Sequence, residues 1–209
     1  MLEVVRSVLQ NRCGLTPLSR LLVAVSAGPD SLCLLHVLWQ LGYSVVVAHL
    51  DHGLRVESAA EAAMVQHFAE DLGVQWVCKR QDVQGYATQN GLSIEEAARN
   101  LRYRYLFEQA ERLEAQAVAV GHNADDQVET VLMHLLRGAG LSGLRGMGHY
   151  SLPNPWSQRI PLVRPLLGIW RGEIQAYLDR SGLKPSLDSS NLELRYYRNR
   201  LRHELIPHL

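Results

Sequence analysis

Six small and polar residues at positions 26–31, Ser-Ala-Gly-Pro-Asp-Ser, follow a short apolar run and precede leucines at helical spacing. This order predicts a strand, a tight turn and a helix start, where free backbone N–H groups and the helix dipole favour an anion such as a phosphate. Gly28 permits close approach or a positive φ, and Pro29 suits a first helical turn. Asp30 would be repelled by a bare phosphate, so it is expected to hold Mg²⁺ or to cap the helix. An ordinary strand–helix turn stays open as the alternative.

Two familiar nucleotide-binding motifs are excluded. A Walker P-loop needs a lysine after its second glycine, and the only two lysines, Lys79 and Lys184, lie outside any such loop. A G-x-G-x-x-G pattern does occur at residues 138–143. It follows a predicted helix rather than a strand, so it lacks the context of a dinucleotide-binding fingerprint.

A second polar motif, His-Leu-Asp-His-Gly-Leu-Arg at residues 49–55, follows a β-branched run. Its two histidines, His49 and His52, have the spacing of metal ligands, but no cysteine or histidine-rich partner motif accompanies them. A strand end favours a nucleotide-lining role for His49 and its neighbours. A purely structural role remains the alternative.

A third motif, at residues 122–130, combines a histidine with several acids. On a helix, His122, Asp126 and Glu129 share one face, which suits Mg²⁺ and proton handling. Acids at a helix start also have a simpler explanation, since they complement the dipole. The opposite face is apolar and is expected to be buried, with Val128, Val131, Leu132 and Leu135.

Two arginine-rich segments complete the set. Residues 95–106 are explained by a solvated amphipathic helix with pairs such as Glu95–Arg99, although Arg102 could reach a phosphate or a base. Near the end, four arginines and two tyrosines combine phosphate contacts with stacking surfaces. The alternative for that stretch is a basic helix end that meets another domain. Its arginines are Arg195, Arg198, Arg200 and Arg202.

The elements that must position these motifs alternate along the chain. Strands are predicted at residues 21–26, 44–49, 74–79 and 116–121, and helices at 30–41, 57–72, 93–114 and 125–136. This alternation indicates an α/β, Rossmann-like, doubly wound parallel sheet, in which ligands bind outside the carboxyl ends of the strands. A Gly- and Pro-rich irregular connection is expected next, then a helix over 170–180 and a C-terminal helical segment over 195–207.

Composition limits the class of protein. The chain has 209 residues and no net charge, but residues 1–136 carry 10 basic and 16 acidic groups while residues 137–209 carry 11 and 5. The neutral total therefore does not argue against a nucleic-acid partner. Three scattered cysteines without C-x-x-C favour a reducing, cytoplasmic compartment. The charge-free residues 31–50 are long enough to span a bilayer, but Gly42 splits them into a helix and a strand, so no membrane partner is expected.

With these motifs in place, the chain resembles a known family. The turn at 26–31 is similar to the PP-loop of N-type ATP pyrophosphatases, which cleave ATP between the α and β phosphates. The segments HLDHGLR, EEAARNLRYRYL, HNADDQVETVLMHLLRGAGLSGLRGM, RPLLGIWRGEIQAYL, DSSN and RYYRNRLRHELIPHL together resemble the tRNA(Ile)-lysidine synthetases, in order and over nearly the whole chain. Ala27 departs from the family's pattern, which has glycine at that position.

The resemblance implies an adenine nucleotide alpha hydrolase-like catalytic domain over residues 1–209, with a nucleotide-binding core at 1–136 and a basic portion at 137–209. The family's tRNA-binding extension is expected to be absent from this chain. The implied enzyme is a carbon–nitrogen ligase that uses ATP and Mg²⁺. It adenylates C2 of the wobble cytidine in tRNA(Ile) with a CAU anticodon, and free L-lysine then displaces AMP to form lysidine. Whether it forms a homodimer is left open.

The resemblance also assigns roles to residues. ATP would lie over Ser26, Ala27, Gly28, Pro29, Asp30, Ser31 and His49. Catalytic roles fall to Asp30, Arg102, His122, Asp126 and Glu129, with Asp30 and Asp126 at the metal. RNA or lysine would contact Arg195, Arg198, Arg200 and Arg202. The alternatives are a PP-loop enzyme that thiolates tRNA, usually with catalytic cysteines, and a non-catalytic nucleotide-binding module.

Overall fold

A six-stranded sheet forms the centre of the chain in the computed structural model, which describes residues 1–53, 58–141, 143–186 and 197–208. The strands are ordered β3-β2-β1-β4-β6-β5, and all are parallel except β5. In chain order they are β1 (Arg20–Ala24), β2 (Ser44–Asp51), β3 (Gln75–Arg80), β4 (Ala117–Ala119), β5 (Tyr150–Ser151) and β6 (Leu162–Val163). The four predicted strands are confirmed. The stretch expected to be irregular contains β5 and β6, which are too short to show a periodic pattern.

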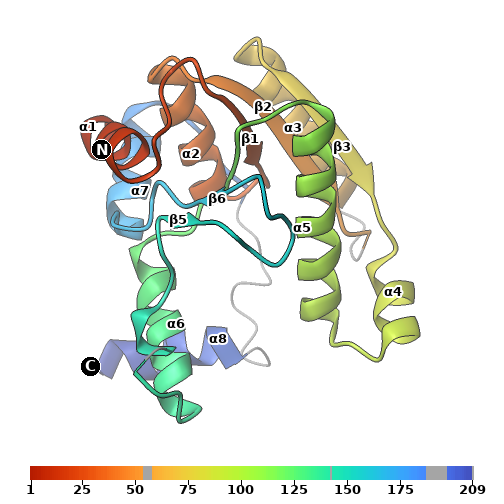
Figure 1. Cartoon of the computed structure of the whole chain (residues 1–209), viewed down its shortest axis with the longest axis vertical. Coiled ribbons are helices and arrows are strands. Elements are labelled where there is room, and N and C mark those ends of the chain that lie inside the picture. The colour runs from red at the N-terminus through yellow and green to blue at the C-terminus, as the bar shows by residue number, and fades with distance from the viewer. Residues whose placement is uncertain (54–57, 142, 187–196, 209) are drawn as a thin grey trace.

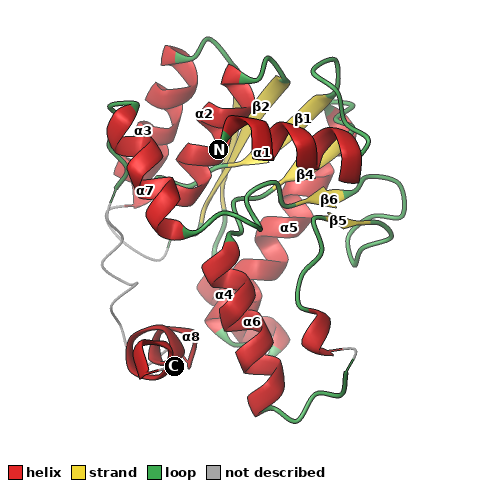
Figure 2. Cartoon of the chain, turned by 90° about the vertical axis from the view of Figure 1, so that its left-hand side faces the viewer, coloured by secondary structure: helices red, strands yellow, loops and turns green. Residues whose placement is uncertain are grey.

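Helices cover both faces of this sheet, as Figures 1 and 2 show. One face is covered by α1 (Leu2–Ser7), its π-helical continuation η1 (Val8–Arg12), α2 (Pro29–Gln40), α3 (Ser58–Asp71) and α7 (Arg171–Arg180). The other face is covered by α4 (Val83–Asn90) and α5 (Ile94–Arg112). Side chains alternate between the faces along a strand, so Leu21 and Val23 of β1 pack on the first face and Leu22 on the second. The doubly wound α/β fold is therefore confirmed.

The ends of the covering helices follow local sequence rules. A capping box opens α5, with Ser93 accepting from the Glu96 N–H and Glu96 accepting from the Ser93 N–H. Gly73, which follows α3, has the positive φ of 64° that a helix end favours. Helix α4 was not predicted, although Asp82 caps its start and Gly91 its end. In the described part of the chain, no helix is long and apolar enough to cross a membrane.

Two helical segments extend beyond the carboxyl ends of the strands. These are α6 (Ala124–Leu136) and the C-terminal run α8 (Tyr197–Arg200), η4 (Leu201–Leu205) and η5 (Ile206–His208); a short 3₁₀ turn, η2 (Gly143–Arg145), follows α6. Figure 1 shows α6 pointing away from the sheet, beside the C-terminal run. The start of the predicted C-terminal helix, at residues 195–196, lies outside the described residues.

The burial expected for α6 is wrong. Leu135 is 55% exposed, and Val128, Val131 and Leu132 are only half-buried. Instead the acidic side is covered, with Asp126 9% and Glu129 1% exposed. The reason is that the first turns of α6 pack against arginines from other segments, while the last turn projects past the body of the molecule. Polar contacts, and not an apolar stripe, place this helix.

Candidate active site

Hydrogen bonds of the Ser31 hydroxyl hold the turn at residues 26–31 together. The Ser31 hydroxyl donates to the Ser26 carbonyl at 2.7 Å, and the Ser26 N–H donates back to the Ser31 Oγ at 3.0 Å. Gly28 is the N-cap of α2, with φ −76°, so no positive φ is needed there. Asp30 does not cap the helix, because α2 has no side-chain cap. The turn therefore leaves the N-terminal N–H groups of a 12-residue helix available to an anion.

Strand β4 ends in close contact with this turn. A Cβ on Gly121 would lie 3.0 Å from the backbone carbon and oxygen of Asp30 and 3.2 Å from the Ser31 nitrogen. Real Cβ atoms are rarely this close to backbone, so glycine lets β4 and the start of α2 approach. Gly121 thus sets the distance between the turn and the residues that follow β4.

Strand β2 contributes two buried polar residues. His49 Nδ1 donates to the Val25 carbonyl at 2.8 Å, which orients the ring. Asp51 accepts from the Gly53 N–H at 2.8 Å. Burial alone would raise the pKa of Asp51, but this hydrogen bond, the Ser58 hydroxyl and the Arg80 guanidinium hold it below its usual range. Asp51 is therefore a fixed negative charge at the carboxyl edge of the sheet.

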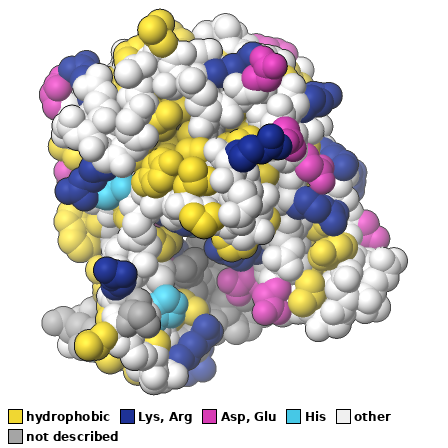
Figure 3. All heavy atoms as spheres, viewed as in Figure 1, with side chains coloured by type: hydrophobic (Ala, Val, Ile, Leu, Met, Phe, Trp, Pro, Cys, Tyr) yellow, Lys and Arg dark blue, Asp and Glu magenta, His cyan; other side chains and the backbone are white. Residues whose placement is uncertain are grey.

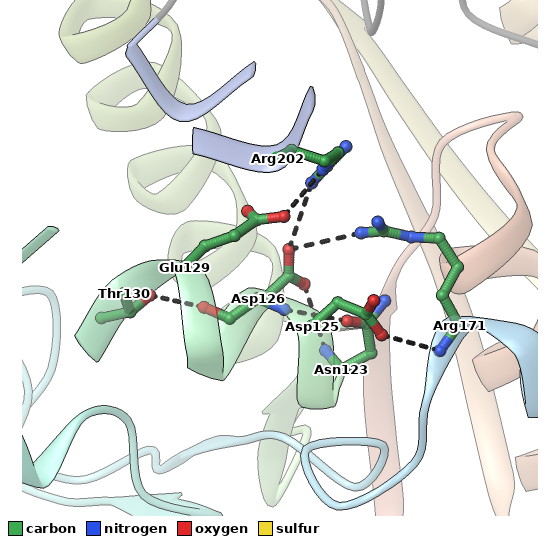
Figure 4. A network of polar contacts seen from close by, with 7 residues as sticks. All are labelled: Asn123, Asp125, Asp126, Glu129, Thr130, Arg171 and Arg202. Atoms are coloured by element: carbon green, nitrogen blue, oxygen red, sulfur yellow. Dashed lines mark hydrogen bonds and ion pairs between the residues drawn. The ribbon is translucent and has the colours of Figure 1, made fainter. Parts of the chain in front are cut away.

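The start of α6 is built around a second capping box (Figure 4). Asp126 N–H donates to Asn123 Oδ1 at 3.0 Å, and Asn123 N–H donates to Asp126 Oδ2 at 3.1 Å. One carboxylate oxygen of Asp126 is thus occupied by the helix cap. His122 precedes the helix instead of sharing its face, so the predicted one-face arrangement of His122 with the two acids is wrong.

Arginines from two other segments reach the acids of α6. Asp126 Oδ1 lies 3.8 Å from Arg171 at the start of α7 and 3.9 Å from Arg202 in the C-terminal run. Arg202 Nε also donates to Glu129 Oε1 at 2.7 Å, and the Arg171 N–H donates to Asp125 Oδ2 at 2.8 Å. Figure 4 shows both guanidinium groups directed at the same carboxylate. These contacts bring three segments of the chain together.

One cavity of about 720 Å³ connects these parts, within the usual range for small-molecule sites. Figure 3 shows this face of the molecule hollowed below the sheet. The predicted site residues that line the cavity are Ser26, Ala27, Gly28, Pro29, Asp30, Ser31, His49, Arg102, His122, Asp126 and Arg202.

Two predicted residues do not line the cavity, and two others are not placed by the described part of the chain. Glu129 does not line the cavity and lies against Arg202. Arg200 does not line it either, and its guanidinium is 3.4 Å from Glu204 on the exposed side of the C-terminal run. Arg198 belongs to α8, but its side chain is not described, and Arg195 lies outside the described residues. The catalytic role of Glu129 and the contacts of these three arginines with RNA or lysine stay predictions.

Sequence reasoning missed some residues in or beside the cavity. Arg171 was expected only as part of a helix, and no local signal marks an arginine whose partner is 45 positions earlier. Asn123 could have been found, because Asn-x-x-Asp before an apolar helix is a variant of the capping-box pattern. Asp51 was grouped with His49 but not singled out. Arg171, Asn123 and Asp51 all help to fix the positions of charged groups around the cavity.

The carboxylate of Asp30 has the character of a cation ligand. Its Oδ1 is buried and forms no hydrogen bond of normal geometry with the described residues. Burial raises the pKa of Asp30 above its ordinary range and the Asp126 carboxylate adds to the rise, while Arg171 and the Asn123 side chain oppose it. No group of three or more metal-ligating side chains occurs in the described ranges. Two nearby carboxylates nevertheless fit Mg²⁺, which commonly takes one or two carboxylates together with phosphates and waters.

No cysteine lines this cavity among the residues described. Cys13 and Cys33 are buried elsewhere, and burial raises the pKa of the Cys33 thiol to about 12. Cys78 lies on β3 and is exposed. A thiolate nucleophile is therefore not available at the site formed by these residues, which disfavours tRNA thiolation by catalytic cysteines.

Curated relatives with one common name match most of the chain. A "tRNA(Ile)-lysidine synthase" from Clostridioides difficile is 39% identical over 91% of this chain and 41% of its own length. Proteins of the same name from Novosphingobium aromaticivorans and Symbiobacterium thermophilum are 45% and 42% identical, over 90% and 100% of this chain and 56% and 43% of their lengths. The chain thus spans about half or less of these relatives.

Solved structures share the fold at low sequence identity. The U34-tRNA thiolase NcsA from Methanococcus maripaludis has a TM-score of 0.71 at 17% identity, covering 88% of this chain and 64% of that one. An NMN synthetase from Francisella tularensis has a TM-score of 0.62 at 13% identity, covering 88% and 70%. The family model described as the PP-loop domain matches residues 2–209, and this chain therefore belongs to the PP-loop domain family.

Proposed function

We propose that this chain is the catalytic domain of a tRNA(Ile)-lysidine synthetase. The supporting observation is that a single cavity is lined by the turn at 26–31, by Arg102 and by the acid–arginine cluster of Asp126, Arg171 and Arg202. Phosphate binding, base binding and amine handling need these three kinds of group side by side. Relatives named for this activity are about 40% identical.

In the proposed first step, O2 of the wobble cytidine attacks the α-phosphorus of ATP and pyrophosphate leaves. The N–H groups at the start of α2 would hold the phosphates against Ser26 and Gly28. Arg102 on α5 and Arg171 on α7 both line the cavity. Their guanidinium groups would stabilise the charge that develops on the phosphate oxygens. His49, held by Val25, would line the nucleotide.

Asp30 and Asp126 would hold Mg²⁺, which supplies charge neutralisation to the phosphate oxygens. The buried Oδ1 of Asp30, which makes no hydrogen bond of normal geometry with the described residues, supports this assignment. Asp126 Oδ2 is engaged in the helix cap, so Oδ1 is the oxygen available for this role or for the amine.

In the second step, the lysine ε-amine attacks C2 of the adenylated base, the bond to the AMP oxygen breaks, and AMP leaves. The amine must first lose a proton, because an ammonium has no lone pair. A cluster that holds the guanidinium of Arg202 at 2.7 Å from Glu129 and 3.9 Å from Asp126 can also hold an ammonium ion. The proposal therefore keeps Asp126, which lines the cavity, for lysine handling, with Glu129 acting through Arg202 and His122 nearby to assist the transfers.

The direct test incubates the protein with ATP, Mg²⁺, labelled lysine and a CAU-anticodon tRNA(Ile) transcript. We expect label on the tRNA and one AMP released per lysine attached. A transcript with uridine at the wobble position is the matched control and should accept no label. If neither this chain nor a version extended to the length of its relatives transfers label, the proposal is wrong.

The same assay separates the alternative of a non-catalytic nucleotide-binding module. Such a module would bind ATP but release no AMP, whether or not the tRNA is present. Binding of ATP without RNA-dependent AMP release would therefore favour it over the synthetase.

A further inference from the structure

A cation–aromatic surface lies on α5 next to the cavity. Tyr103 lines the cavity and its ring stacks on Trp156, with centroids 4.0 Å apart and planes 15° apart. The guanidinium of Arg99 lies 4.9 Å from the Tyr103 ring centre and 5.7 Å from that of Trp156. Arg102, on the same helix, lies 5.9 Å from the Tyr103 ring and borders the cavity. The surface thus runs from the cavity wall outward along α5.

The arginines of this surface are not neutralised. Arg99 is exposed, and the expected pair with Glu95 does not form within the described residues. Arg102 likewise has no carboxylate at ion-pair distance in the described part of the chain, although the charge of Glu95 favours its protonated form from farther away. Elsewhere on the helix the pattern differs, since Arg104 pairs with Glu108 at 3.8 Å. Two arginines without an ion pair, one lining the cavity and one beside it on the same helix, favour an anionic ligand.

A braced loop presents the tryptophan to this helix. Asn154, buried at 7% exposure, accepts from the N–H groups of Trp156 and Ser157 at 3.1 and 3.0 Å. Its amide donates to the Ile160 carbonyl at 3.0 Å. Arg159 then ties the loop to α5 through Glu111 at 2.7 Å. The position of Trp156 is therefore set before any ligand arrives.

We propose that Arg99, Trp156 and Arg102 form a binding surface for the single-stranded RNA next to the target cytidine. Arginine planes and aromatic rings stack on splayed-out bases, and the same arginines contact phosphates. A base that enters the cavity brings its neighbouring nucleotides to this rim. This inference rests on the proposed function and adds to it the residues that hold the flanking nucleotides.

The test measures the concentration of a CAU anticodon stem–loop RNA that half-saturates AMP release, with ATP binding measured separately. Arg99→Glu should raise that concentration at least tenfold, with unchanged ATP binding and thermal midpoint. Arg104→Glu changes the net charge equally on the same helix and should shift it less than twofold. If Arg99 contacts a phosphate, Arg99→Glu should also make the slope of log K against the logarithm of the salt concentration shallower by about 0.7.

Trp156 is tested by a pair of variants. Trp156→Ala should raise the half-saturating RNA concentration about tenfold, as expected for one lost stacking contact. Trp156→Phe keeps an aromatic ring and should stay within threefold, which separates stacking from misfolding of the loop.

The outcomes distinguish this surface from the activity itself. Equal effects of Arg99→Glu and Arg104→Glu, or no effect of Arg99→Glu on an active enzyme, would overturn the surface alone. A wild-type protein that neither binds the stem–loop nor releases AMP with it would overturn the surface and the proposed function together.

Discussion

Two regions of the cavity are built in different ways. The turn at 26–31 is braced mainly by hydrogen bonds between Ser26 and Ser31, five positions apart, and has one long-range hydrogen bond, from the Ser186 N–H to the Ala27 carbonyl. The cluster on α6 joins Glu129 to Arg202, 73 positions away, and Asp125 to Arg171, 46 positions away. The first region is therefore mainly local and the second depends on the docking of two distant segments. Substitutions in the two regions should therefore differ in their effects on activity and on stability.

The largest expected effect is on catalysis at the long-range cluster. Asp126→Asn removes one negative charge while an amide oxygen can still accept from the Asn123 N–H, so the helix cap is kept. We expect AMP release to fall at least about 100-fold, the usual cost of removing a positioned charge from an active site. AMP release with saturating RNA, lysine and ATP is the measurement.

The companion variant Asp126→Ala removes the cap as well. It should lose the same activity and about 1 kcal/mol more stability than Asp126→Asn in urea denaturation. If either variant released AMP at the wild-type rate, Asp126 would not belong to the active site.

The next effect is on the stability of the contact between Arg202 and Glu129. Their side chains are 22% and 1% exposed, so the two single variants should differ. Arg202→Met takes the guanidinium away from a buried carboxylate and should cost about 3 kcal/mol. Glu129→Gln leaves a guanidinium that can reach water and should cost about 1.5 kcal/mol.

A double-mutant cycle sharpens this result. If the C-terminal run is docked by this pair, the double variant should be less destabilised than the sum of the two singles. Additive losses in urea denaturation would mean that the two side chains act independently and that docking has another cause.

The difference between the regions also explains what could be predicted. The strands, the helix starts at Pro29 and Ser93, and the tight turn at 26–31 follow from periodicity and turn residues, which are local. The burial of the α6 acids does not, because it depends on Arg171 and Arg202, whose distance in space no local pattern encodes. The apolar side of α6 was expected to be buried, and this was wrong for the same reason. The side of α6 that is buried is the one whose acids pair with arginines from other segments.

A smaller effect is expected where β4 meets the turn. Gly121→Ala places a Cβ 3.0 Å from the Asp30 backbone, which must shift. We expect a loss of about 1–2 kcal/mol in stability, as for overpacking, and weaker ATP binding by isothermal titration. Gly172→Ala is the control, since its Cβ meets nothing within 4 Å and alanine favours helix α7. Equal ATP affinities for both variants would show that the turn tolerates this displacement.

The smallest effect concerns Ala27, where the family pattern has glycine. Glu114 is the only non-glycine residue with a positive φ in the described part of the chain, so Ala27 has ordinary backbone geometry. Its side chain is 3% exposed and packs in the core, and its carbonyl accepts from the Ser186 N–H at 2.8 Å. Ala27→Gly should therefore leave ATP affinity unchanged and lower the stability by about 0.5–1 kcal/mol, through lost packing and a more flexible unfolded chain. A gain in stability or in ATP affinity would mean that the turn is strained by alanine, and that its geometry is less local than the contacts of Ser31 indicate.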